Sequence, residues 1–192
     1  MIAIIKYNAG NTASVANTLT QLGCACKITD NKEEIASANK VIFPGVGEAS
    51  SAMRYLKQHN LDKLILSLTQ PLLGICLGLQ LMCKHSEEGD TTCLGIFDSE
   101  VKLFSSTDIV PHMGWNNLSN MKTNLLKGIN NSDDFYFVHS YYAELSAESI
   151  AVCDYINPFS AAMNKNNFYA TQFHPEKSAL VGKTILKNFI EL

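Results

Sequence analysis

The order of apolar segments along the chain is the feature that most constrains its fold. Short runs rich in isoleucine and valine, such as residues 2–7, alternate with longer stretches whose apolar residues recur every three or four positions. The run at 71–75 is apolar throughout, as expected of a strand that is buried on both faces. Strands that alternate with helices form a mainly parallel sheet covered by those helices. The sequence therefore predicts an α/β fold.

The expected elements follow from this alternation and from the residues that interrupt it. Asn11 and Thr12 can cap the first helix, which Gly23 ends, and the segment 44–47 breaks the chain before another helix. From 91 to 167 the apolar runs are short and are separated by polar turns, which indicates a more antiparallel region. We predict strands at 2–7, 24–29, 40–43, 71–75, 100–104, 135–139, 150–155, 160–163 and 168–173, and helices at 12–22, 48–59, 61–68, 77–85 and 179–191, with a polar link after residue 29.

Length and composition exclude several classes of protein. With 192 residues, 46% of them hydrophobic, the chain has the size and composition of one globular domain, which we expect to span residues 1–192. The net charge of −3 leaves no excess of positive charge for general nucleic-acid binding. Fourteen of the 15 basic residues are lysine and only Arg54 is arginine, so we do not expect a phosphorylated substrate held by arginines.

The six cysteines could form three disulfides, but the chain opens without a basic segment and a following apolar stretch of the kind that directs secretion. We therefore expect free thiols and a cytoplasmic location. No Cys-x-x-Cys or His-x-x-x-His pair is present to complete a tetrahedral site, so we expect no metal ion. Five of the six cysteines are expected to be packing residues.

The remaining cysteine has the surroundings of a nucleophile. Cys76 lies in Gly74-Ile75-Cys76-Leu77-Gly78, between the buried strand and a helix. This is a Gly-x-nucleophile-x-Gly elbow, whose tight turn needs glycines and which holds the thiol at the carboxyl edge of the sheet. The start of the following helix favours the thiolate, and the amide of Leu77 is placed to donate to an oxyanion. Plain packing at a strand–helix junction is the alternative interpretation.

A cysteine nucleophile needs a base and a group that orients this base. His174 follows a predicted strand, and Pro175 holds it in an extended conformation. In an extended chain, His174 and Glu176 project to the same face, so the carboxylate can fix the tautomer of the imidazole. A solvated loop is the alternative for these residues alone, but together with the elbow they predict a triad of Cys76, His174 and Glu176.

The other histidines are expected to have no catalytic role. His139 lies in a strand of Phe, Val and Tyr residues and is predicted to be a hydrogen-bonded core residue. His112 and Trp115 lie in an apolar turn that could be core or contact surface. His59 and His85 lie near predicted helix ends, beside charged residues, and are expected to be solvated.

Several segments together resemble those of class I glutamine amidotransferases, and among them the glutaminase subunits of imidazole glycerol phosphate synthases. The cysteine elbow and His174-Pro175-Glu176 are shared across the whole class. Pro44-Gly45-Val46-Gly47, Gly114-Trp115-Asn116 and His139-Ser140-Tyr141-Tyr142 narrow the resemblance to this subunit, and the matches run nearly end to end. The chain departs from the pattern at Lys6, Asn8 and Ala49, which leaves the detail of a partner interface open.

The resemblance implies a three-layer, flavodoxin-like fold and a glutaminase reaction. Cys76 would attack the side-chain amide of glutamine, while His174, held by Glu176, moves the protons and water hydrolyses the thioester. The second oxyanion-hole amide would be that of Val46, opposite Leu77, after a peptide rotation that the flanking glycines permit. For the glutamine pocket, the resemblance implies Gly47, Gln80, Glu88, Ser140 and Tyr141. Glu88 would bind the substrate ammonium; a solvated acidic turn is the alternative.

The resemblance also implies a partner, a cyclase subunit of (β/α)8-barrel fold that forms a heterodimer with this chain and receives the ammonia. It implies no cofactor. Three other functions stay open: an amidotransferase subunit for anthranilate, guanylate or pyridoxal phosphate synthesis, a cysteine peptidase or hydrolase of the same fold, and a non-catalytic binding module. The last of these should have lost a triad residue, and none is missing.

Overall fold

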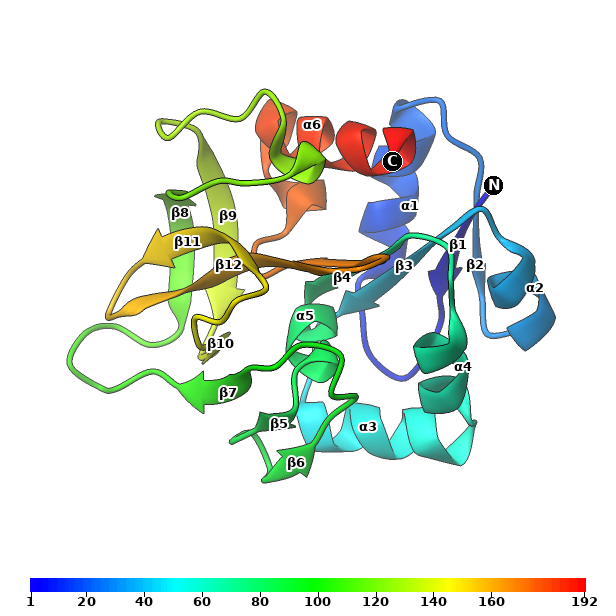
Figure 1. The fold of residues 1–192 in the computed structure, drawn as a ribbon, viewed down its shortest axis with the longest axis horizontal. Coiled ribbons are helices and arrows are strands. Elements are labelled where there is room, and N and C mark those ends of the chain that lie inside the picture. The colour runs from blue at the N-terminus through cyan, green and yellow to red at the C-terminus, as the bar shows by residue number, and fades with distance from the viewer.

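A seven-stranded sheet forms the centre of the computed structural model, which describes residues 1–192 (Figure 1). In order across the sheet, the strands are β11 (Ser149–Asp154), β12 (Pro158–Lys165), β13 (Phe168–Thr171), β4 (Leu72–Cys76), β3 (Lys40–Gly45), β1 (Ile2–Ile5) and β2 (Cys26–Thr29). The five strands from β13 to β2 are parallel, and β11 and β12 are antiparallel. The parallel part has the 2-1-3-4-5 order of flavodoxin-like folds.

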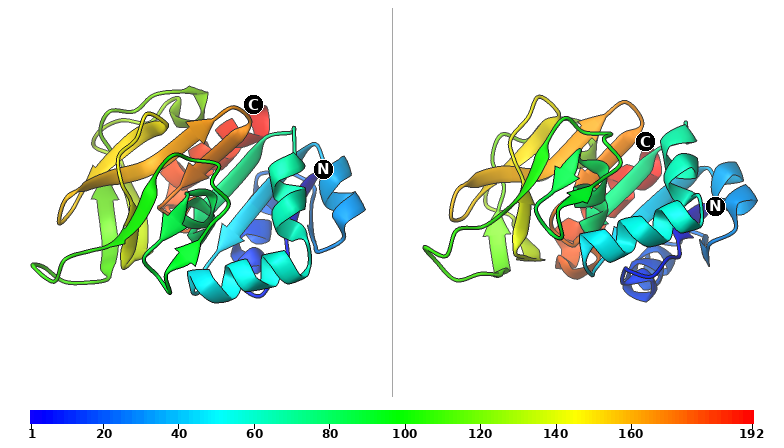
Figure 2. Two further views of the ribbon diagram at one scale, coloured as in Figure 1. Left: turned by 60° about the horizontal axis from the view of Figure 1, so that its bottom comes forward. Right: turned by 90° about the horizontal axis from the view of Figure 1, so that it is seen from below.

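Helices cover both faces of this sheet (Figures 1 and 2). On one face lie α1 (Thr12–Gln21) and α6 (Ala179–Glu191). On the other lie α2 (Lys32–Ser37), α3 (Ala49–Gln58), α4 (Leu61–Ser67) and α5 (Leu77–Met82). This three-layer arrangement confirms the predicted fold class. No helix has both the length and the apolar character needed to cross a membrane.

Side chains of the central strands alternate between the two cores. In β1, Ile4 packs with the core under α1 and α6, whereas Ile5 packs with the core under α3 to α5. In β4, Leu73 belongs to the first core and Leu72 to the second, and all four side chains are fully buried. Both faces of the strands are therefore covered, which explains the continuous apolar run at 71–75.

The second half of the chain adds two smaller sheets. One has the order β10 (Tyr141–Ala143), β7 (Glu100–Leu103), β5 (His85–Ser86) and β6 (Thr91–Thr92), and the other pairs β8 (His112–Asn117) with β9 (Asp134–His139). Two short 3-10 helices, η1 (Asn124–Leu126) and η2 (Pro175–Lys177), complete the structure. Only β5 and β7 pair in parallel here, so the predicted antiparallel character of this region is confirmed.

Three predicted segments are wrong in detail. The expected polar link after residue 29 is the helix α2, which Asn31 caps and in which only Ile35 is buried, so its sequence shows no apolar repeat. The helix predicted at 77–85 ends at Met82, because His85 belongs to β5 and pairs with Thr92 of β6. The expected turn around His112 is the strand β8, whose partner β9 lies more than 15 residues further along the chain.

Candidate active site

Cys76 stands at a sharp turn between β4 and α5. Its backbone has φ +54° and ψ −107°, a conformation that costs free energy for a residue with a side chain. The two glycines of the elbow are required by space: a Cβ on Gly74 would lie 2.6 Å from the sulfur of Met82, and one on Gly78 would overlap the carbonyl oxygen of Phe43. Close packing of α5 against β3 and β4 thus enforces the turn that presents Cys76 at the carboxyl edge of the sheet.

His174 and Glu176 follow β13 at the same edge. Nδ1 of His174 lies 2.8 Å from Oε1 of Glu176, and both side chains are only 1% exposed. The backbone around them is fixed, because the His174 amide donates to the Tyr136 carbonyl and the Ser178 hydroxyl donates to the His174 carbonyl. An ionised carboxylate can only accept a hydrogen bond, so Nδ1 carries the proton here and Nε2 is left for chemistry.

The electrostatics of His174 connect it to Cys76. Burial alone would lower the pKa of His174, but the negative charge of the Cys76 sulfur and then the bond to Glu176 outweigh it and raise the pKa to about 10. Nε2 is buried and makes no well-formed hydrogen bond, so the sulfur acts on the ring mainly through its charge. The imidazolium form of His174, next to the Cys76 sulfur, is therefore favoured at neutral pH. The predicted triad is brought together.

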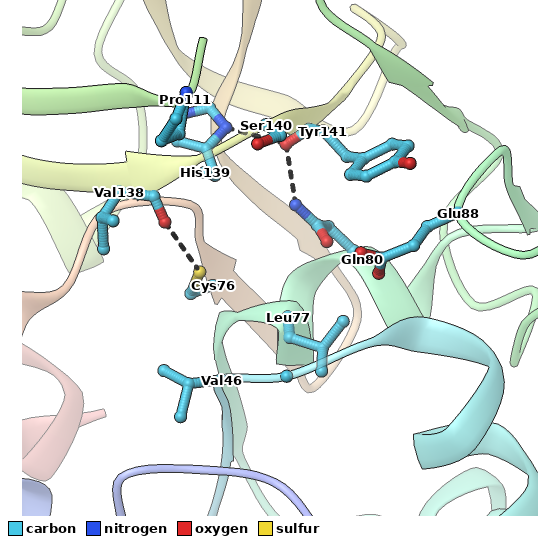
Figure 3. Close-up of a pocket in the computed structure, with 11 residues that line it drawn as sticks. Val46, Cys76, Leu77, Gln80, Glu88, Pro111, Val138, His139, Ser140 and Tyr141 are labelled. Carbon is cyan, nitrogen blue, oxygen red and sulfur yellow. Dashed lines mark hydrogen bonds between the residues drawn. The ribbon is translucent and has the colours of Figure 1, made fainter.

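A pocket of about 340 Å³ opens in front of the Cys76 sulfur (Figure 3). Eight residues predicted for the site line it, while His174 and Glu176 lie outside its lining. The sequence did not single out three further lining residues, Pro111, Val138 and His139, as pocket residues. The eight are Val46, Gly47, Cys76, Leu77, Gln80, Glu88, Ser140 and Tyr141.

The expected oxyanion segment is held by the loop that follows β1. The Tyr7 hydroxyl donates to the Pro44 carbonyl at 2.7 Å, and the Gly10 amide donates to the Val46 carbonyl at 3.1 Å. Gly47 has φ +141°, a conformation that side chains rarely permit. Val46 and Leu77 both line the pocket that holds the Cys76 sulfur.

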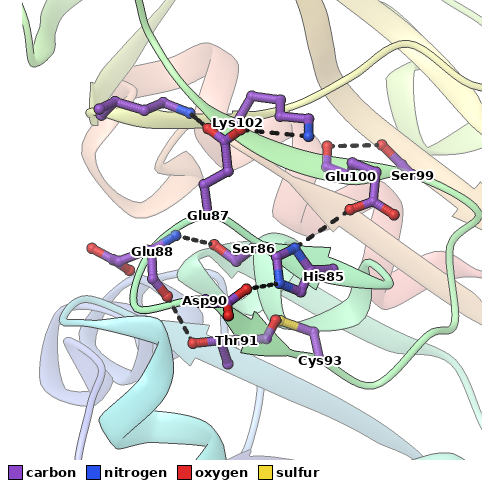
Figure 4. A network of polar contacts seen from close by, with 11 residues as sticks. His85, Ser86, Glu87, Glu88, Asp90, Thr91, Cys93, Ser99, Glu100 and Lys102 are labelled. Carbon is purple, nitrogen blue, oxygen red and sulfur yellow. Dashed lines mark hydrogen bonds and ion pairs between the residues drawn. The ribbon is translucent and has the colours of Figure 1, made fainter.

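Glu88 reaches the pocket from the turn between β5 and β6 (Figure 4). Its backbone amide donates to the Ser86 hydroxyl, and its carbonyl accepts from the Thr91 hydroxyl at 2.7 Å. Oε2 accepts the Ala49 amide at 2.7 Å, which joins this turn to the start of α3. Burial raises the pKa of Glu88, the bond from Ala49 opposes this, and the nearby Glu48 adds to it. Glu88 is thus a held pocket carboxylate and not a solvated turn.

Gln80 uses both protons of its amide inside the protein. Nε2 donates to the Tyr141 carbonyl at 2.8 Å and to Oε1 of Gln172 at 3.1 Å (Figure 3 draws the first of these). Only Oε1 of Gln80 remains for a ligand, so this residue can accept a hydrogen bond from a ligand but cannot donate one. The sequence prediction placed Gln80 in the pocket without this restriction on its role.

The prediction for His139 is confirmed: it is a buried, hydrogen-bonded core residue. Its Nδ1 lies 2.7 Å from the Tyr141 carbonyl, its Nε2 lies 3.1 Å from Nδ1 of His112, and burial lowers its pKa to about 3. His112 is likewise buried, whereas Trp115 is 55% exposed. Of the two interpretations left open for that segment, core holds for His112 and surface for Trp115.

Besides Val138, whose carbonyl oxygen lies 4.0 Å from Sγ of Cys76, one further residue that contacts the sulfur was missed. Gln172 is fully buried, and its Nε2 lies 3.6 Å from Sγ of Cys76. The signal that could have found it is its position two residues before His174, because alternate residues of an extended chain share a face.

Comparisons with known proteins agree with this geometry. Residues 3–192 match the family model described as "Glutamine amidotransferase class-I". The chain is 56% identical to "Imidazole glycerol phosphate synthase subunit HisH" of Bacteroides fragilis (strain YCH46), over 100% of this chain and 99% of that protein. It is 48% identical to "Imidazole glycerol phosphate synthase subunit HisH 2" of Legionella pneumophila (strain Philadelphia 1), over 100% and 98%.

Solved structures agree in fold. A putative GMP synthase protein from Thermoplasma acidophilum superposes with a TM-score of 0.75 at 21% identity, over 99% of this chain and 92% of that one. The structure of PurLQS from Thermotoga maritima superposes with a TM-score of 0.73 at 14% identity, over 99% and 97%. At these identities the likeness concerns the fold alone.

Proposed function

The chain belongs to the class I glutamine amidotransferase family, and from this premise we propose that it is the glutaminase subunit of an imidazole glycerol phosphate synthase, which serves histidine biosynthesis. The observation that carries the activity is the Cys76 sulfur in the pocket wall, beside the buried pair of His174 and Glu176. Full-length identity to the HisH relatives supports this subunit over those for anthranilate, guanylate or pyridoxal phosphate synthesis. We also propose that residues 1–192 act as one domain.

The first half of the reaction releases ammonia. The Cys76 thiolate attacks the side-chain amide carbon of glutamine, and the carbonyl oxygen becomes an oxyanion that the amides of Leu77 and Val46 stabilise. The carbon–nitrogen bond then breaks as His174 donates its Nε2 proton to the leaving nitrogen. Ammonia departs and a glutamyl thioester remains on Cys76. Glu176 keeps Nδ1 bound throughout, so the proton moves only at Nε2.

The second half restores the enzyme. Nε2 of His174, now neutral, takes a proton from water as the water oxygen attacks the thioester carbon. The carbon–sulfur bond breaks, glutamate leaves, and the thiolate–imidazolium pair is regained. The sum of both halves is glutamine and water to glutamate and ammonia, with no cofactor.

The pocket offers groups suited to the amino-acid end of glutamine. Oε2 of Glu88 is occupied by the Ala49 amide, which leaves Oε1 to bind the α-ammonium. Oε1 of Gln80 can accept a second proton from the same group, because both protons of its Nε2 are used elsewhere. Gly47, Ser140 and Tyr141 complete the pocket wall around the substrate backbone.

The released ammonia needs an acceptor, since free ammonia is protonated in neutral water and ceases to be a nucleophile. The subunit naming of the relatives supports a complex with a partner chain. We propose that the partner is a cyclase of (β/α)8-barrel fold, that it forms a heterodimer with this chain, and that it holds the phosphorylated substrate. The single arginine of this chain fits that division. Six cysteines without a disulfide support a cytoplasmic location.

Conversion of labelled glutamine to glutamate, measured with the partner cyclase and its ribonucleotide present, tests this function. The wild-type complex should release glutamate, and both Cys76→Ala and His174→Asn should abolish the release. The partly buried Cys93→Ala is the matched control for loss of a thiol, and its turnover should be unchanged. Equal turnover by wild type and Cys76→Ala would refute the proposed nucleophile.

A further inference from the structure

Gln172 occupies a position that the glutaminase mechanism above does not use. It follows β13, and its backbone amide donates to the Ala161 carbonyl at 2.8 Å, so the segment is fixed at the sheet edge. Its side chain is completely buried and ends between the Cys76 sulfur and the Gln80 amide. A buried side-chain amide is costly unless its hydrogen bonds are made, and these two neighbours are its partners.

The orientation of the Gln172 amide follows from its neighbours. The Tyr141 carbonyl can only accept, so Gln80 must turn its NH2 group toward it. The second proton of that NH2 group then points at Gln172, which must present its oxygen. The NH2 group of Gln172 is therefore left facing the sulfur of Cys76, at 3.6 Å. This chain of partners excludes the flipped amide, in which an oxygen would oppose the sulfur.

A second chain of partners holds the Tyr141 carbonyl in place. It also accepts from His139, whose ring lies 2.7 Å away, so Nδ1 of His139 carries the proton. The carbonyl oxygen thus has both its acceptor positions filled, by Gln80 and by His139. Both hydrogen bonds to the Tyr141 carbonyl oxygen are thus made within the protein. Tyr141, in β10, therefore fixes the orientation of the Gln80 amide and, through it, that of the Gln172 amide.

We propose that Gln172 is a further catalytic residue, whose side-chain N–H donates to the Cys76 thiolate and holds the sulfur at the pocket. The inference rests on the proposed function only where it treats this sulfur as the nucleophile for glutamine. A hydrogen bond to a charged sulfur is stronger than one to a neutral thiol, so the contact favours the ionised form. Gln80 and the Tyr141 carbonyl act through it as positioning groups.

The pH dependence of alkylation of Cys76 by iodoacetamide tests this in the full-length chain. The Cys76 peptide is followed by mass spectrometry, so that the other five cysteines do not contribute. Gln172→Met keeps the length and removes the donor, and the midpoint of the pH profile should rise by about 1–2 units. Gln172→Glu keeps the bond from Gln80 and sets an acidic oxygen against the sulfur, and its midpoint should rise at least as far.

Gln70→Met is the matched control. Gln70 also donates from Nε2 to backbone carbonyls, those of Ile35 and Ala36, but it lies before β4, at the opposite end of that strand from Cys76. Its alkylation profile should equal that of the wild type. A merely structural role of Gln172 would lower the melting temperature of its variants and leave their midpoints unchanged, and that result would overturn the proposal.

A measurement on the unaltered side chain covers the case in which variants at Gln172 do not fold. In a 15N-labelled chain, the side-chain NH2 signals of Gln172 should shift with pH as Cys76 ionises, and this shift should be absent in Cys76→Ala. If the NH2 signals of Gln172 do not shift as Cys76 ionises, the proposal is overturned. If the alkylation midpoints rise as expected while no glutamine is hydrolysed, the proposed function fails and the assignment of Gln172 as the thiolate donor stands.

Discussion

Replacement of His139 should make the fold less sensitive to acid. His139 is 6% exposed, and burial lowers its pKa from the ordinary 6.5 to about 3. As the pH falls, His139 therefore binds a proton near pH 6.5 in the unfolded chain but only near pH 3 in the folded chain. Because the unfolded state binds more protons in this window, stability is lost as the pH falls through it.

The size of the effect follows from the two pKa values. At pH 5 the solution lies about 1.5 units below the unfolded pKa, and each unit is equivalent to ~1.4 kcal/mol, so His139 removes about 2 kcal/mol of unfolding free energy relative to pH 7. In His139→Asn this loss should be absent. The new amide can still donate to the Tyr141 carbonyl, although it leaves Nδ1 of His112 without a partner, which lowers stability at every pH.

Urea unfolding at pH 7 and pH 5, followed by circular dichroism, tests this prediction. The quantity compared between wild type and variant is the unfolding free energy that each loses between the two pH values. The wild type should lose about 2 kcal/mol more than His139→Asn between the two pH values. His59→Asn, on the exposed end of α3, is the control and should lose as much as the wild type. Equal losses in His139→Asn and wild type would refute the reasoning, because His139 would then not exclude a proton in the folded state.

Three further predictions concern the reaction. Glu176→Gln keeps the shape but removes the charge held 2.8 Å from Nδ1 of His174, so kcat for glutamine should fall by about 10–100-fold in steady-state assays, and an unchanged kcat would contradict the role of this carboxylate. Glu88→Gln removes the charge that faces the substrate ammonium, so KM should rise by about 10–100-fold, whereas a change in kcat alone would argue for a different role. The isolated chain should hydrolyse glutamine poorly and be activated at least about tenfold by the liganded cyclase, because the Val46 amide then completes the oxyanion hole; full turnover by the chain alone would contradict this.

The fold could be predicted for segments whose own residue pattern shows which of their faces are buried. The strand at 71–75 is apolar because both its faces are covered, and Gly74 and Gly78 mark the turn because neighbouring atoms leave no room for a Cβ. The helix α2 could not be predicted in this way. Asn31 caps this helix and only one of its residues, Ile35, is buried, so its sequence shows no apolar repeat.

The site was predictable as a set of residues but not as a set of hydrogen bonds. Cys76 and His174 lie in short motifs whose local geometry explains their choice, whereas the glutamine-pocket residues were predicted from the family resemblance. The role of Gln172 depends on Gln80, 92 residues earlier in the chain, and on the Tyr141 carbonyl. The orientation of these side-chain amides depends on partners that are distant in the sequence, so no local sequence pattern predicts it.

The most direct test of the central claim uses the complex with the cyclase and its ribonucleotide substrate, and compares two nitrogen sources. Cys76→Ala should abolish synthesis of imidazole glycerol phosphate from glutamine and leave synthesis from added ammonia at the wild-type rate, since ammonia bypasses the proposed nucleophile. Loss of both activities would assign a structural role to Cys76, and retention of glutamine-dependent synthesis would contradict a glutaminase built on this sulfur.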